Sequence, residues 1–189
     1  MTELEAVLSS DEMSNSQLVH RVYPLLVGLL LGLVQTGLFF QLSFTYSSNF
    51  RTYVMVVIGW LMGSVVGLRV ATKWPIPTNG FLLMALFAYA ISSSMLQLRP
   101  FETTFGFLYA FLTILIGIYP GVFFARMGTI YQVRQLFFYE NNGFIIGLVG
   151  ATLLFMLVGR LGIWVSPVLV ASLVIILGMY GNQYDILPT

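Results

Sequence analysis

The polar side chains best suited to chemistry stand together in the stretch YENNG, where one carboxylate and two carboxamides precede an apolar run. Glu140 could hold a proton or a cation there, while the amides of Asn141 and Asn142 orient a ligand. At a helix start the same residues would instead cap free backbone N–H groups, and the acidic side chain would favour the helix dipole. We expect a helix cap, and a ligand site is the alternative.

Gln35 is the fourth polar candidate and lies in the middle of the first apolar run. A glutamine at that depth would be stabilised by a partner on another helix, in a contact worth about 0.6 kcal/mol. We interpret Gln35 as an inter-helix contact, with a place in a solute pathway as the alternative. Gln41 and the serines at 92–94 are interpreted as packing groups as well.

The residue types exclude most other kinds of active site. The sequence has no Cys and one His, His20, which excludes disulfides, thiolate metal sites, iron–sulfur clusters and haem held by paired histidines. It offers no Ser–His–acid set and no paired intramembrane carboxylates. We therefore expect a protein that is not an enzyme and that binds no cofactor.

The composition places these residues in a membrane. Of 189 residues, 58% are hydrophobic and only 8% are charged, with a mean hydropathy of +0.91. An ordinary soluble domain carries about 25% charged residues, so the solvent of this chain must be mainly lipid. The net charge of +1 provides no basic field for nucleic acid. The expected fold is an all-α, polytopic membrane protein in a lipid bilayer.

Six segments reach the length of about 20 mostly apolar residues that a membrane span requires. They form a predicted transmembrane domain over 23–181, after a polar N-terminal tail (1–22) and before a short C-terminal tail (182–189). The tail is acidic and too long for a cleavable signal peptide, so the first helix is expected to remain. The predicted spans are 23–42, 53–71, 79–98, 103–124, 141–159 and 162–181.

An even number of spans puts both termini on one side of the membrane. Basic residues are more frequent on that side, which predicts cytoplasmic termini. The basic residues on the predicted inner side are Arg21, Arg69, Lys73, Arg126 and Arg134, against Arg51, Arg99 and Arg160 on the other. The connection 125–140 alternates aromatic and basic residues and is predicted to lie along the headgroups. Short loops fit a bacterial-type inner or photosynthetic, thylakoid-like membrane.

Glycines four residues apart recur in the first, second, fourth and fifth spans. Such spacing lines one helix face with small residues and lets two backbones approach closely in lipid. It also fits two inverted three-helix repeats, although ordinary close packing explains the same glycines without a repeat. The glycines predicted to pack helices are Gly28, Gly32, Gly59, Gly63, Gly67, Gly117, Gly121, Gly143 and Gly147.

Two of these glycine stretches resemble a known membrane module. The segment GWLMGSVVG (59–67) is similar to the second helix of the membrane domain of integral-membrane spermidine-synthase-like proteins, and ENNGFIIG (140–147) with the later RLG (160–162) resembles a further helix of that domain. Members of the family often carry Glu and Arg in the first helix, where this sequence has Gln35 and Gln41. The Rossmann-like aminopropyltransferase domain and its G-x-G-x-x-G motif are missing. The resemblance implies a membrane module without the enzyme.

Two functions remain in view. The first is a non-catalytic accessory or assembly subunit that packs against a larger membrane complex. The second is a small dimeric transporter of a solute or ion, in which the chain's partner is a second copy of itself. A transporter needs Gln35, Ser93 or Gln97 to share a polar cavity with the start of the fifth span. An accessory subunit leaves these residues apart, and the different depths in the sequence favour it.

Overall fold

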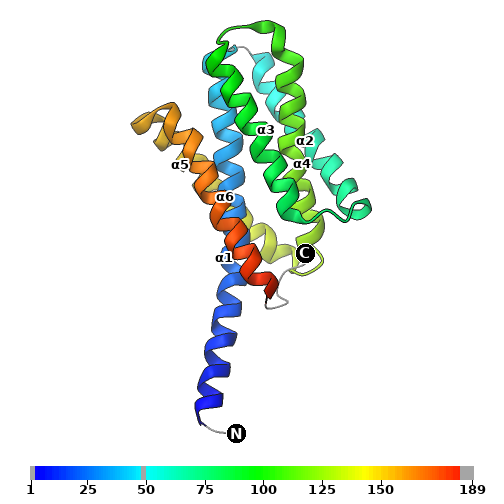
Figure 1. The fold of residues 1–189 in the computed structure, drawn as a ribbon, viewed down its shortest axis with the longest axis vertical. Coiled ribbons are helices and arrows are strands. Elements are labelled where there is room, and N and C mark those ends of the chain that lie inside the picture. The colour runs from blue at the N-terminus through cyan, green and yellow to red at the C-terminus, as the bar shows by residue number, and fades with distance from the viewer. Residues whose placement is uncertain (1–2, 48–49, 184–189) are drawn as a thin grey trace.

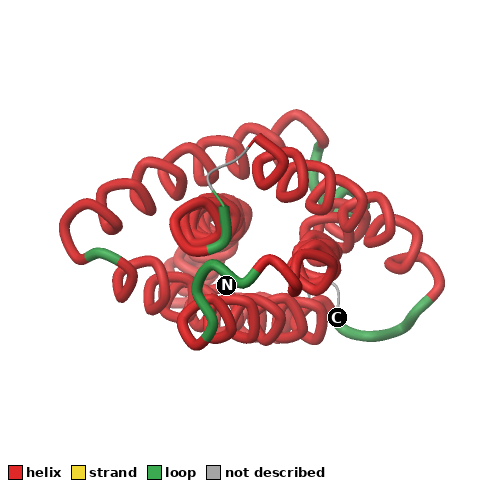
Figure 2. The backbone as a smooth tube through the Cα atoms, turned by 90° about the horizontal axis from the view of Figure 1, so that it is seen from above, coloured by secondary structure: helices red, strands yellow, loops and turns green. Residues whose placement is uncertain are grey.

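The fold consists of helices and short connections. The computed structural model describes the backbone of residues 3–47 and 50–183 and the side chains of 20–47 and 50–179. In Figure 2 every described segment is either helix or loop. The helices are α1 (Glu3–Thr45), α2 (Phe50–Lys73), α3 (Thr78–Leu98), α4 (Gly106–Met127), α5 (Val133–Val158) and α6 (Arg160–Gln183), with a 3₁₀ turn at Thr103–Phe105.

All six α-helices are long and apolar enough to cross a bilayer, so the prediction of an all-α, six-span membrane protein is confirmed. Within the part of α1 whose side chains are described, the candidate span is His20–Thr45, and the helix continues back to Glu3 through the segment predicted as a tail. In Figure 1 this N-terminal part of α1 projects well past the bundle.

Proline and glycine set the helix boundaries. α3 starts immediately after Pro77, which is its N-cap residue. The helix ends at Leu98, because Pro100 disfavours the helical conformation of Arg99 before it. α5 and α6 are separated by Gly159 alone, whose φ of 71° and ψ of −146° suit glycine rather than a residue with a side chain. The Gly159 N–H donates to the Phe155 carbonyl, which closes the end of α5.

The bundle is organised around α1 and α4, the two most buried helices. α5 and α6 pack on α1, while α2 and α3 pack on α4 (Figure 1). The largest interfaces join α1 to α5 and α2 to α4, followed by those of α3 with α4 and of α1 with α6. If α1, α2 and α3 are matched with α4, α5 and α6 in that order, the α1–α5 interface corresponds to the α2–α4 interface, and the α3–α4 interface corresponds to the α1–α6 interface. This correspondence is expected for two inverted three-helix halves.

The glycine contacts of the α1–α5 interface also correspond, residue by residue, to those of the α2–α4 interface. A methyl group on Gly28 of α1 would overlap the carbonyl oxygen of Glu140, three residues before Gly143 in α5. A methyl group on Gly117 of α4 would overlap the carbonyl oxygen of Trp60, three residues before Gly63 in α2. The remaining matched pairs of glycine and carbonyl are Gly32–Phe144 with Gly121–Ser64, Gly143–Leu25 with Gly63–Ile114, and Gly147–Leu29 with Gly67–Ile118.

These contacts define two helix crossings. We call them the α1–α5 crossing, which includes Gly28, Gly32, Gly143 and Gly147, and the α2–α4 crossing, which includes Gly63, Gly67, Gly117 and Gly121. Residue numbers rise together along both members of each pair, so both crossings are parallel. Gly59, one turn earlier in α2, faces the side chain of Thr113. Close backbone approach is the main source of helix affinity in lipid, so these crossings hold the bundle together.

Candidate functional site

The structure places Glu140, Asn141 and Asn142 inside α5 rather than at its start. α5 begins at Val133, eight residues before the predicted span, and Gln132 occupies the N-cap position. The helix-cap hypothesis for these three residues is therefore wrong. Residues 133–140 of the predicted connection 125–140 belong to α5, and the position of this segment along the headgroups stays a prediction. The physical reason is that Leu136 is buried against the bundle, which extends the packed face of α5 towards its N-terminus.

The three polar residues of the cluster point to different surroundings. Glu140 is buried, with 6% of its surface exposed, and its backbone carbonyl meets Gly28 in the α1–α5 crossing. Its carboxylate has no hydrogen-bond or ion-pair partner among the described residues. Asn141 and Asn142 are exposed, and the Asn142 amide donates back to the Phe138 carbonyl at 2.6 Å. The carboxylate and the amides therefore do not converge on one ligand position.

Gln35 lies apart from this cluster. It is half-buried and makes no hydrogen bond to a described residue. It continues the face of α1 that carries Gly28 and Gly32, two turns further along. Two turns correspond to about 10 Å along the helix axis. Gln35 and Glu140 thus belong to the same interface but occupy different depths.

The best-formed polar contact inside the bundle was not anticipated as a unit. Gln41 is buried at the C-terminal part of α1, and its amide donates to the Tyr89 hydroxyl at 2.8 Å. Tyr89 of α3 in turn donates to the Ile163 carbonyl of α6 at 2.8 Å. Gly37 leaves room for the ring, since a Cβ there would lie 2.6 Å from the Tyr89 hydroxyl. This contact ties α1, α3 and α6 together.

The centre of the bundle between its halves is dry. A cavity of about 10 Å³ lies there, lined by side chains of α1, α2, α3 and α4 such as Leu30, Val34, Trp60, Leu82 and Ile116. A water molecule needs at least about 10–15 Å³ and several polar partners, so this space remains empty. Neither this cavity nor the two larger ones at the end of the bundle is lined by Gln35, Ser93 or Gln97.

The described residues also contain no group of three His, Cys, Asp or Glu able to hold a metal ion. The polar residues of the spans are thus divided among separate helix contacts and the outer face of α5. Comparisons of this chain with protein-family models, curated proteins and solved structures found no match. The resemblance to the spermidine-synthase-like membrane domain therefore stays a prediction.

Proposed function

We propose that this protein is a non-catalytic accessory or assembly subunit that packs against a larger membrane complex through the outer face of α5. The observation that carries the proposal is the exposure of Asn141 and Asn142 on this helix. They are the ninth and tenth of its 26 residues. A helix of that length spans about 39 Å, whereas the hydrocarbon core is about 30 Å thick. The two amides accordingly lie at hydrocarbon depth.

An amide at this depth has no water to bond. Lipid tails cannot satisfy its donors and acceptor, so a neighbouring helix that supplies hydrogen-bonding side chains is the favourable environment. Asn142 uses one amide hydrogen within its own helix, and no described residue bonds to the side chain of Asn141. A partner helix carrying hydroxyl or amide side chains would complete both.

The surface around the two asparagines suits a helix partner. Among the six helices α5 has the least buried apolar stretch, and the exposed residues that follow the asparagines include Ile145, Ile146, Val149 and Leu153. Inside the bundle, Gln41 is already bonded to Tyr89. An accessory subunit can leave its polar groups in such separate contacts.

The test compares the native complex of the wild type with that of the double variant Asn141→Leu/Asn142→Leu. Each protein is purified from its native membrane in mild detergent, and subunits that stay bound are quantified by native gel and mass spectrometry. We expect one stoichiometric larger complex with the wild type and a loss of at least tenfold with the variant. Ser172→Val is the matched control, because Ser172 is an exposed polar residue of α6 that bonds only to its own helix.

A complex that survives the double variant unchanged would exclude docking through this face. Size-exclusion chromatography of each variant distinguishes lost docking from misfolding. We propose the same orientation and location as the sequence predicts: a bacterial-type inner or photosynthetic membrane, with both termini in the cytoplasm.

A small dimeric transporter is the second candidate, and one observation favours it. The matched interfaces of α1–α3 and α4–α6 are what two inverted halves would produce, and many transporters with inverted repeats bind solute at the interface of those repeats. The dry central cavity means that such a cycle would require a second conformation with an open path. A clean homodimer without further subunits in the purification would favour transport, and Glu140→Gln would then be the first variant for an uptake assay.

A further inference from the structure

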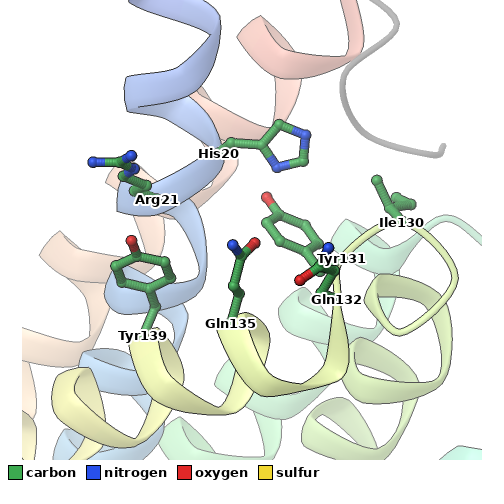
Figure 3. Close-up of a pocket in the computed structure, with 7 residues that line it drawn as sticks. All are labelled: His20, Arg21, Ile130, Tyr131, Gln132, Gln135 and Tyr139. Atoms are coloured by element: carbon green, nitrogen blue, oxygen red, sulfur yellow. The ribbon is translucent and has the colours of Figure 1, made fainter.

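A polar cavity of about 320 Å³ lies at the end of the bundle, where α1 leaves it and α4 connects to α5. Figure 3 shows the residues that line it. His20 and Arg21 come from α1, and residues 130–132 come from the connection between the apolar helices α4 and α5. Gln135 and Tyr139 come from the first two turns of α5. The cavity therefore lies at the boundary of the apolar spans.

The lining is rich in hydrogen-bond donors and carries positive charge. Arg21 brings a guanidinium, Gln132 and Gln135 bring amides, and Tyr139 brings a hydroxyl. A second cavity of about 320 Å³ shares Gln132, Gln135 and Tyr139 and adds Arg134. No Asp or Glu is among the described residues that line either cavity. Two arginines thus flank one donor-rich wall, which suits an anion.

Tyr131 provides an independent indication of a ligand. Only 7% of this residue is exposed, and its hydroxyl has no hydrogen-bond partner among the described residues. In Figure 3 the hydroxyl points into the space between His20 and Gln135. Burial raises the pKa of Tyr131, so the phenol stays protonated and remains a donor. A buried donor without a partner is costly, and a ligand oxygen would remove that cost.

The position of Tyr131 is fixed by its neighbours. Its ring meets the His20 ring edge to face, with 4.5 Å between the centroids. Two residues further on, α5 begins at Val133, and the N-cap residue Gln132 makes no side-chain capping bond. The positive end of the α5 dipole therefore lies beside Gln132, which lines the cavity.

We propose that this cavity binds a phosphate group, held by Arg21, the amide of Gln135 and the hydroxyl of Tyr131, with the charge of Arg134 in the adjoining cavity. The phosphate could belong to an anionic lipid headgroup or to a soluble phosphate ester, since both present the same oxygens to the donors. Arg134 lies two turns before Asn141 on the outer face of α5, whereas Arg21 and Tyr131 lie off that face. Phosphate binding that is lost in Tyr131→Phe while the larger complex is retained therefore separates this site from the proposed docking function.

The experiment uses the full chain purified in a neutral detergent. One arm titrates phosphatidylglycerol against phosphatidylcholine and counts the retained lipids by native mass spectrometry. The other arm titrates glycerol 3-phosphate and inorganic phosphate by calorimetry. Selective retention of phosphatidylglycerol alone identifies a lipid site, and saturable binding of the soluble phosphates identifies a site for a soluble ester. Absence of both overturns the proposal.

Three variants localise the binding. Arg21→Gln/Arg134→Gln should weaken it at least tenfold, and both side chains are exposed, so the fold is expected to persist. Tyr131→Phe keeps the ring packed against His20 and should weaken binding about threefold to tenfold through the loss of one hydrogen bond. Arg69→Gln is the matched control, an exposed arginine on the same side of the bundle that lines neither cavity. Equal weakening by Arg69→Gln, or no effect of the other two, would contradict the site.

Discussion

The α1–α5 crossing and the α2–α4 crossing share one packing register but differ in chemistry. In each, four glycines meet carbonyl groups that lie three residues before the partner's glycines. Gly28 of α1 faces the carbonyl of Glu140, and the corresponding Gly117 of α4 faces the carbonyl of Trp60. One turn later the corresponding residues are Phe144 and Ser64.

This comparison separates what a crossing requires from what it tolerates. The glycines are required, because backbone contact leaves no room for a Cβ. The intervening side chains are free to vary, since they point beside the contact. In the α2–α4 crossing one of these side chains makes a hydrogen bond between the helices, in which the Ser64 hydroxyl donates to the Gly117 carbonyl at 3.2 Å. In the α1–α5 crossing the same freedom places a carboxylate without a described partner at the interface.

The largest expected effect comes from breaking either crossing with a methyl group. Gly147→Ala would press the new Cβ against the Leu29 carbonyl, and Gly67→Ala would press it against that of Ile118. Backbone atoms cannot rotate away, so the helices must separate. We expect each variant to lower the free energy of unfolding by about 2–3 kcal/mol. The measurement is equilibrium unfolding in bicelles, with both variants followed in parallel.

Gly150→Ala is the control for that experiment. It lies in α5 as well, but its Cβ would meet only the Leu33 Cδ2, at 4.0 Å. Alanine favours helix over glycine by up to about 1 kcal/mol, so this variant should be neutral or more stable. Sensitivity of one crossing and tolerance in the other would contradict their equivalence.

The glycine spacing shows how much the sequence could predict. The length of the apolar runs identified the spans, and the period-four glycines identified the residues of both crossings, because close approach in lipid has few chemical solutions. The spacing could not predict which helices pair, since Gly28 and Gly32 would fit any of the other three glycine stretches. Pairing depends on the whole bundle, which a local pattern does not contain.

The polar residues were harder to predict for a related reason. Glu140, Asn141 and Asn142 are adjacent in sequence, but consecutive residues on a helix point about 100° apart. That rotation turns Glu140 into the bundle and the asparagines out of it. The start of α5 was misplaced because Arg134 and Gln135 interrupt the apolar pattern within a helix that is already formed. A glutamine within an apolar run, such as Gln41, indicates a contact with another helix. Its partner Tyr89 lies 48 residues further along the chain, so the sequence pattern does not identify it.

A smaller effect is expected from removing the charge that distinguishes the α1–α5 crossing. A carboxylate at membrane depth costs roughly 2.5–3.5 kcal/mol when ionised, whereas an amide of the same shape carries no charge. Glu140→Gln should therefore raise the free energy of unfolding in bicelles by about 1 kcal/mol. Glu102→Gln, whose carboxylate pairs with Arg99 at the surface, should change it by less than about 0.5 kcal/mol. A loss of stability in Glu140→Gln would mean that the carboxylate has a stabilising partner in the membrane.

The smallest expected effect tests the hydrogen bond between helices that, among the described residues, is found in the α2–α4 crossing and not in the α1–α5 crossing. The Ser64 hydroxyl reaches two carbonyls, that of Trp60 in its own helix at 3.0 Å and that of Gly117 at 3.2 Å. Ser64→Ala removes this contact without adding bulk, so we expect a loss of about 0.6 kcal/mol in the free energy of unfolding. Thr152→Val in α5 is the control, because Thr152 bonds only to the Leu148 carbonyl of its own helix. If the two variants lose the same stability, the hydroxyl of Ser64 serves its own helix, and close backbone packing alone joins α2 to α4.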